Sequence, residues 1–157
     1  MSWFRKVTSS AEGDLTPLVA AMDYYSREYE EGVKATKPEP GMRLWEISRA
    51  IPGHMAHRYN QYQELNAIHE WLEDRETAMI RRGADELQKH YARALSTRDA
   101  LTLAETDENV LAMRTIRIEV KLLANKFAGI TKGLEMLHFQ VGYLTKMREA
   151  GIEDATI

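Results

Sequence analysis

Basic side chains collect around residues 75–98, with one tyrosine among them. This stretch carries six arginine or lysine residues and only three acidic ones. Arginine and lysine hold phosphate groups, and an exposed aromatic ring can stack on an unpaired base, so the combination is typical of proteins that bind single-stranded nucleic acid. The residues that we predict to bind DNA are Arg75, Arg81, Arg82, Lys89 and Arg93.

The spacing of these cations predicts a shared helix face. Four of them follow one another at steps of seven, seven and four: Arg75, Arg82, Lys89 and Arg93. Arg81 lies about 100° away from Arg82 around a helix. Tyr91 continues an apolar series with Leu87 and Leu95, so we expect it in the core rather than on a base-stacking surface. The plainer interpretation of the whole stretch is a solvated or ion-paired helix face. In that case DNA would have to be sought along a second basic stretch, at Arg114, Arg117, Lys121 and Lys132.

Side chains for catalysis or metal binding are sparse. Glu135 and His138 match the Glu-x-x-His unit of di-iron helical bundles, but such a site needs a second unit, and His54 and His57 do not form one. The sequence contains no glycine-rich phosphate loop, no Gly-x-Ser-x-Gly motif and no cysteine nucleophile. We therefore expect a protein that is not an enzyme and that holds neither a metal nor a cofactor.

The element that positions these residues is a long C-terminal helix with a heptad pattern. From Met113 to Leu144, apolar residues recur at alternating steps of three and four over ten successive positions. This period is typical of a helix packed against a partner with a left-handed twist. We predict self-association through the seam formed by Val120, Leu123, Phe127, Ile130, Leu134, Leu137, Val141 and Leu144.

A second apolar set lies on other positions of the same helix. Its members are Ile118, Leu122, Met136, Phe139, Tyr143 and Met147. A helix that is apolar on more than one side is covered by more than one neighbour. Two interpretations stay open: the central helix of an ordinary bundle, or a helix that packs within its own chain on one side and against other copies on another.

Proline and glycine divide the chain into segments. Residues 1–41 form an N-terminal extension with one expected helix, which begins at Thr16 and Pro17 and ends in the turn-forming stretch 34–41. Residues 42–151 form the helical core and oligomerisation domain, and residues 152–157 an acidic tail. We expect the extension to be separable from the core, and we expect a kink at Ile51-Pro52, because proline disfavours helix at the residue before it.

Composition sets the broad class. With 44% apolar residues in 157, the chain can bury a core, and the net charge of −3 hides strongly alternating local charge. There is no cysteine, and no stretch approaches the roughly 20 apolar residues of a membrane span, so we expect a cytoplasmic protein. The patterns together predict an all-α fold: an elongated helical hairpin or bundle with a long C-terminal heptad helix, assembling as a homo-oligomer.

From about Leu44 to Gly151 the chain resembles the UvsY family, the recombination mediator proteins of tailed phages. The resemblance consists of the order of elements and four local stretches: IPGHMAHRY at 51–59, HYARA at 90–94, LAETDENV at 103–110 and KMREAG at 146–151. In the family, basic DNA-binding residues directly precede an aromatic pair followed by glycine. Here Arg81 and Arg82 lie further ahead of His90 and Tyr91, and no glycine follows. Residues 1–41 extend beyond the family pattern.

The resemblance implies a non-enzymatic helical protein that forms a ring-like homo-oligomer through its C-terminal helix. It also implies binding to single-stranded DNA, to a RecA-like recombinase and to single-strand-binding protein, in the cytoplasm of an infected bacterium. Our leading hypothesis is therefore a recombination mediator that holds single-stranded DNA by repeated phosphate contacts. The alternative is a helical phage structural or assembly adaptor protein without DNA binding, in which the basic stretches pair with acidic partners.

Overall fold

The described part of the chain is entirely helical. The computed structural model describes residues 2–11, 13–39, 41–91 and 94–151. Within these ranges there are five helices and no strand, as the heptad and amphipathic patterns predict. The helices are α1 (Trp3–Thr8), α2 (Thr16–Ala35), α3 (Leu44–His90), α4 (Thr97–Ala104) and α5 (Glu108–Glu149).

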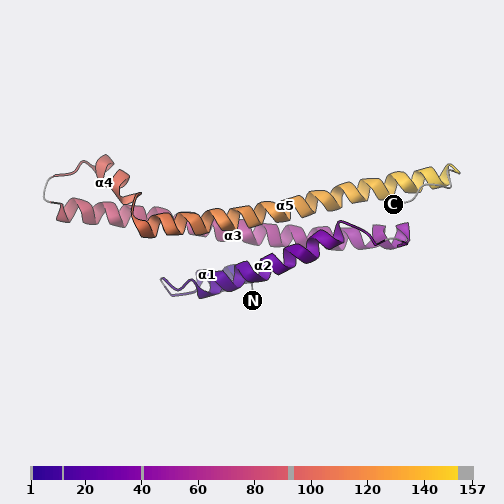
Figure 1. Ribbon diagram of the computed structural model, residues 1–157, viewed down its shortest axis with the longest axis horizontal. Coiled ribbons are helices and arrows are strands. Elements are labelled where there is room, and N and C mark those ends of the chain that lie inside the picture. Colours follow the sequence, from indigo (N-terminus) through magenta and orange to yellow (C-terminus); the bar gives the residue numbers. More distant parts are fainter. Residues whose placement is uncertain (1, 12, 40, 92–93, 152–157) are drawn as a thin grey trace.

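The frame of the molecule is a long antiparallel hairpin. α3 has 47 residues and α5 has 42, which corresponds to lengths of about 70 Å and about 63 Å. The two helices lie side by side over most of their length, α4 lies at the turn between them, and α2 runs along the hairpin (Figure 1). The predicted elongated fold with a long C-terminal helix is confirmed.

The sequence predicts a kink at Pro52, and the helix does not end there. α3 is one continuous helix from Leu44, with Pro52 inside it. Proline lacks the backbone N–H that would bond to the carbonyl group one turn earlier, which here belongs to Ser48. Ile47 and Ile51, which precede the proline, are buried against Leu137 and Val141 of α5. Met55, which follows the proline, packs against the same cluster, so the helix is held on both sides of Pro52.

The main core lies midway along the hairpin and draws on four helices. Its fully buried large side chains include Leu65, Ile68 and Leu72 of α3 and Phe127 and Leu134 of α5. Burying a side chain of this size stabilises a fold by roughly 1.5 to 3 kcal/mol. The middle of the hairpin is thus its most strongly packed part.

The N-terminal extension contributes to this same core. It contains two helices rather than one, and Val7 of α1 and Leu18 and Tyr25 of α2 are buried in the main cluster. The backbone N–H of Phe4 and the hydroxyl group of Tyr25 both donate to the carboxylate of Glu64, over 2.9 Å and 2.5 Å. Burial, followed by this hydrogen bond, raises the pKa of Tyr25 far above its usual value. This packing argues against a separable extension.

α4 closes the turn end of the hairpin through small side chains. Ala84 of α3 packs with Ala100 and Ala104 of α4, and a Cβ at Gly83 would lie 3.3 Å from Cβ of Ala104. The hydroxyl group of Ser96 accepts the backbone N–H of Asp99 over 3.1 Å and caps the helix. The segment between the two long helices therefore contains a short docked helix.

Among the described residues, no helix is both long enough and apolar enough to cross a membrane.

Candidate nucleic-acid interface

The last turns of α3 carry most of the cations predicted to bind DNA. Arg81, Arg82 and Lys89 are exposed, and among the described residues neither Arg81 nor Lys89 has an ion-pair partner. Arg75 is half-buried, with its guanidinium carbon 4.6 Å from the centre of the Trp71 ring. Such a contact leaves a guanidinium edge able to meet a phosphate. Arg93 lies outside the described residues.

Tyr91 is exposed, and the prediction that it belongs to the core is wrong. Its side chain is 53% exposed. The reason is that α3 ends at His90: Tyr91 is the C-cap residue, with extended backbone angles of φ −74° and ψ 134°. The helical spacing from Leu87, which is half-buried, no longer applies beyond the end of the helix. An exposed ring next to Lys89 and His90 has the chemistry needed to stack on a base.

A groove opens where the end of α3 meets α4 and the start of α5. Its volume is about 980 Å³. One wall presents Arg82, Glu86, His90 and Tyr91, and the other presents Leu103, Thr106, Asp107 and Asn109. Asp107 caps α5 by accepting the backbone N–H of Asn109 over 2.9 Å. The groove thus combines an arginine, an aromatic ring and polar side chains that can hydrogen-bond to a base, and sequence reasoning did not find its α4 and α5 side.

The arginines of the second basic stretch form ion pairs within the chain. Glu76, which is 5% exposed, accepts Nε of Arg114 over 2.7 Å and Nε of Arg117 over 2.8 Å. Burial alone would raise the pKa of Glu76, but the hydrogen bonds from Arg114 and Arg117 outweigh it and hold the pKa below its usual value. These two arginines therefore neutralise a buried carboxylate.

The remaining cations of that stretch have internal partners too. Nζ of Lys121 donates to Oδ1 of Asn66 over 3.2 Å, and Nζ of Lys132 lies 2.7 Å from Oε2 of Glu135. The same Glu135 belongs to the Glu-x-x-His unit, whose His138 is exposed beside Phe139. Among the described residues, no group of three or more His, Cys, Asp or Glu side chains is placed to hold a metal ion.

A further buried polar cluster holds α2 on α3. Glu28 accepts Nη1 of Arg58 over 2.6 Å and Nε2 of Gln61 over 2.8 Å, and His57 lies 3.4 Å away. Although burial opposes it, the hydrogen bonds from Gln61, Arg58 and His57 hold the pKa of Glu28 below its usual value. Arg58 is 6% exposed, so this cluster belongs to the fold and is not a surface for ligands.

The seam predicted for self-association is buried within the single chain. All eight of its side chains are between 0% and 8% exposed: Val120, Leu123, Phe127, Ile130, Leu134, Leu137, Val141 and Leu144. They pack against α3 and α2, because the hairpin brings those helices to the same face of α5. Contact between subunits would need a different surface.

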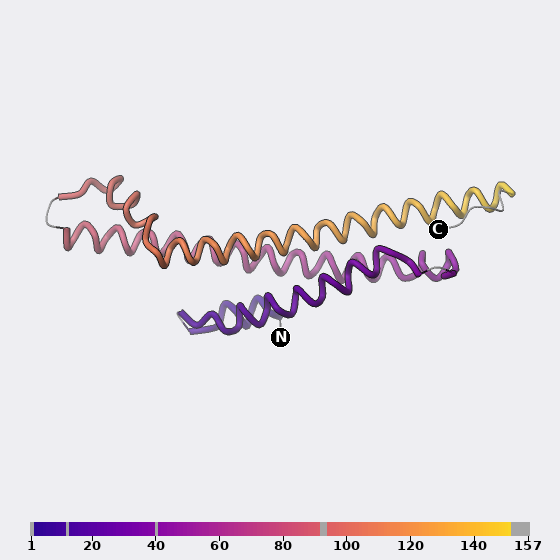
Figure 2. Tube along the Cα trace, in the orientation of Figure 1, coloured from indigo at the N-terminus to yellow at the C-terminus, as the bar shows by residue number. Residues whose placement is uncertain are grey.

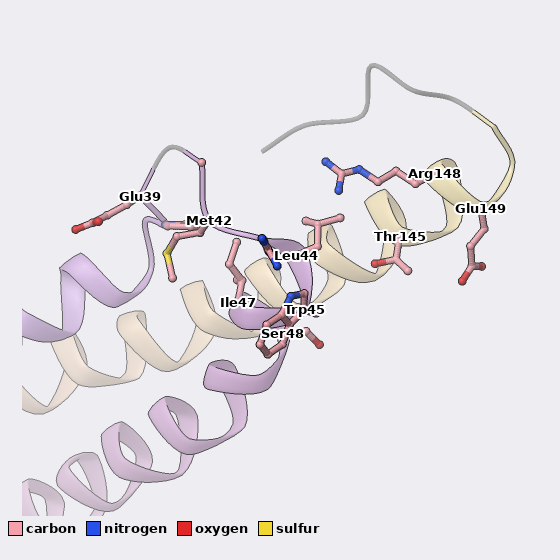
Figure 3. Close-up of a pocket in the computed structure, with 12 residues that line it drawn as sticks. Glu39, Met42, Leu44, Trp45, Ile47, Ser48, Thr145, Arg148 and Glu149 are labelled. Atoms are coloured by element: carbon pink, nitrogen blue, oxygen red, sulfur yellow. The ribbon is translucent and has the colours of Figure 1, made fainter.

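A second hollow, of about 770 Å³, lies at the other end of the hairpin between the start of α3 and the end of α5 (Figure 3). Its rim carries Glu39 and Glu149 as well as Arg43 and Arg148, and Trp45 is 57% exposed beside it. The groove at the end of α3 likewise combines Arg82 with Glu86 and Asp107, so charge alone does not separate the two sites.

No family model, curated protein or solved structure matches the chain. The fold and the site by themselves define an all-α protein, built on a long helical hairpin, whose exposed cations and aromatic ring meet at the turn end.

Proposed function

We propose that this chain is a recombination mediator, a non-enzymatic protein that binds single-stranded DNA and helps to load a RecA-like recombinase onto it. The observation that carries the proposal is the exposed ring of Tyr91 at the groove, next to Lys89 and beyond Arg81 and Arg82 along α3. A single strand offers both a phosphate chain for the cations and unpaired bases for the ring. Single-strand-binding protein is a further proposed partner, and the proposed location is the cytoplasm of an infected bacterium.

The pairing of Arg114 and Arg117 with Glu76 favours a second candidate function. If the cations at the end of α3 also serve only protein contacts, the chain is a helical structural or assembly adaptor without DNA binding. DNA binding separates the two functions, because an adaptor of that kind needs no affinity for a phosphate chain.

The test is a salt titration of binding to a single-stranded oligonucleotide, followed by fluorescence anisotropy, with the matching duplex as comparison. A mediator should bind the single strand more tightly, with a log–log slope of about −0.7 for each phosphate neutralised. Arg81→Ala with Lys89→Ala should weaken binding and flatten that slope by about 0.7 for each phosphate that is no longer neutralised. Tyr91→Leu should weaken binding by about 1 to 3 kcal/mol without changing the slope, because it removes stacking but no charge.

Matched controls lie elsewhere on the same helix. Tyr59 is 50% exposed, close to the 53% of Tyr91, and Arg49 is an exposed cation near the start of α3. Tyr59→Leu and Arg49→Ala should leave affinity unchanged. If the unmodified protein shows no salt-dependent binding to single strands, the mediator function is rejected and the adaptor function remains. A binding-competent protein should also speed recombinase assembly on DNA coated with single-strand-binding protein.

A further inference from the structure

The outward face of α5 carries a second heptad stripe that the chain leaves uncovered. Starting at Leu111, alternating steps of four and three connect eleven residues that are all exposed. They are Leu111, Thr115, Ile118, Leu122, Asn125, Gly129, Lys132, Met136, Phe139, Tyr143 and Lys146, and we call them the outer stripe. Figure 2 shows α3 and α2 on one side only of the C-terminal half of α5.

The outer stripe is strongly apolar in two places. Ile118 and Leu122 are 48% and 57% exposed, and Met136, Phe139 and Tyr143 are 65% to 66% exposed. Exposed apolar side chains that gather in a contiguous patch mark an interaction surface, whereas scattered ones do not. The spacing of the stripe is that of a helix–helix seam, so its natural partner is another helix with the same period.

We propose that the outer stripe binds the outer stripe of a second copy, with the two α5 helices antiparallel and a two-fold axis between residues 130 and 131. In this register Leu122 meets Phe139 of the other copy, and Ile118 meets Tyr143. Ile118 and Leu122 of each copy therefore cover Phe139 and Tyr143 of the other copy. The contact occurs twice in the dimer. The contact is closed by symmetry, so two copies complete it.

The positions of charged residues favour this arrangement over a parallel pairing and over a shifted antiparallel register. A parallel pairing in register would place Lys132 against Lys132 and Lys146 against Lys146 inside the seam. The antiparallel register places Lys132 over Gly129 and Lys146 over Thr115 instead. Like charges in contact destabilise a seam, and opposite charges stabilise it. Shifting the antiparallel register by one heptad would set Leu122 against Lys132 in one direction and against Lys146 in the other.

Gly129 is compatible with this arrangement, and its surroundings are as open as those of Gly53 and Gly142. A glycine inside a helix costs roughly 1 kcal/mol relative to alanine, and a Cβ at Gly129 would meet nothing within 4 Å. In the dimer this position lies next to the two-fold axis, where the two helices cross most closely and the stem of Lys132 needs room. Lys132 also keeps Glu135 at 2.7 Å, so its amino group has a counter-charge beside the seam.

The area that the contact buries is close to the lower limit for a specific interface. Aromatic side chains bury about 150–250 Å² each, and the two apolar clusters of both copies together remove on the order of 1,000 Å² from water. This value reaches the range of specific protein–protein contacts. The proposal is independent of DNA binding, since the end of α3 and the outer stripe use different residues.

The absence of cysteine from the sequence allows a direct test by cross-linking. Leu122→Cys with Phe139→Cys, treated with a short bis-maleimide, should give a cross-linked dimer in high yield. Either substitution alone should not cross-link, because equal positions are about 25 Å apart in the antiparallel register. Cross-linking of Phe139→Cys alone would establish a parallel pairing and overturn the proposal. A higher yield from Leu122→Cys with Lys132→Cys would establish the shifted register and overturn it as well.

Sedimentation of the unmodified protein and of one disrupting variant completes the test. We expect a dimer, and we expect Phe139→Asp to weaken it on the order of 100-fold, because each dimer loses two rings and gains two carboxylates in the seam. Helix content should stay the same, since Phe139 is exposed in the single chain. The matched control is Val19→Asp on α2, where the side chain is 58% exposed and lies outside the stripe. An unmodified protein that sediments as a monomer at about 100 μM overturns the proposal.

Discussion

Gly32 of α2 lies directly against Ile130 of α5. A Cβ at position 32 would stand 2.6 Å from Cδ1 of Ile130 and 3.1 Å from Nε of Arg58. This close approach brings α2 down onto the hairpin and positions Tyr25 against Phe127, whose ring centres are 5.9 Å apart. Glycine is therefore required at position 32 by packing and not by backbone conformation.

Replacing Gly32 tests this contact. Gly32→Ala should lower the free energy of unfolding by about 1 to 3 kcal/mol through overpacking, although alanine favours helix by roughly 1 kcal/mol. Combining it with Ile130→Val, which removes Cδ1, should recover part of the loss. Urea unfolding followed by circular dichroism measures both. Gly53→Ala is the control, because nothing lies within 4 Å of its Cβ position; a Gly32→Ala protein as stable as this control would contradict the contact.

Removing residues 1–41 should destabilise the remaining chain strongly. The truncation uncovers Leu65 and Phe127, which are 1% and 0% exposed, and it leaves Glu64 without its two donors from Phe4 and Tyr25. We expect a lower and broader thermal transition. A truncated protein that melts with unchanged midpoint and cooperativity would restore the separable extension predicted from the linker at 34–41.

Tyr25 allows a finer version of the same test. Tyr25→Phe keeps the buried ring and removes only the hydrogen bond to Glu64, so we expect a loss of about 1 kcal/mol. Tyr25→Ala removes the ring as well and should cost roughly 3–5 kcal/mol. Chemical unfolding of both variants measures the difference. Equal losses would mean that the ring adds nothing to the core.

The carboxylate of Glu76 predicts acid sensitivity. Its pKa is lowered in the folded chain, so the unfolded chain binds the proton more readily. The contribution of Glu76 to the free energy of unfolding is complete above the pKa that it has in the unfolded chain, about 4.3. This contribution is lost as the pH falls from that value through the lower pKa of the folded chain. Glu76→Gln should cost about 1 to 3 kcal/mol at neutral pH and should make the decline in acid shallower, leaving the part due to Glu28.

Thermal unfolding between about pH 3 and pH 7 measures this effect, because that range spans the pKa of glutamate in the unfolded chain. Glu70→Gln, at an exposed glutamate on the same helix, is the control and should leave the curve of stability against pH unchanged. A Glu76→Gln protein whose acid decline is as steep as that of the unmodified chain would show that the two arginines do not hold this carboxylate ionised.

The sequence alone determined the helical class, the long C-terminal helix and the burial of its heptad seam. These features depend on local period and propensity, and a run of ten apolar positions from Met113 to Leu144 leaves no other regular structure that buries them together. The periodicity does not say which helix covers the seam. In the hairpin α3 and α2 cover the seam, and the outer stripe of α5 stays exposed.

Only the tertiary structure decided which charged and aromatic residues are available at the surface. Arg114 and Arg117 meet Glu76 across sequence separations of 38 and 41 residues, and no local pattern encodes a pairing at that distance. Tyr91 is exposed because α3 ends one residue before it, and the ends of helices depend on how the next segment docks. Local period thus fixes which side chains share a face, whereas packing between distant segments fixes what each face meets.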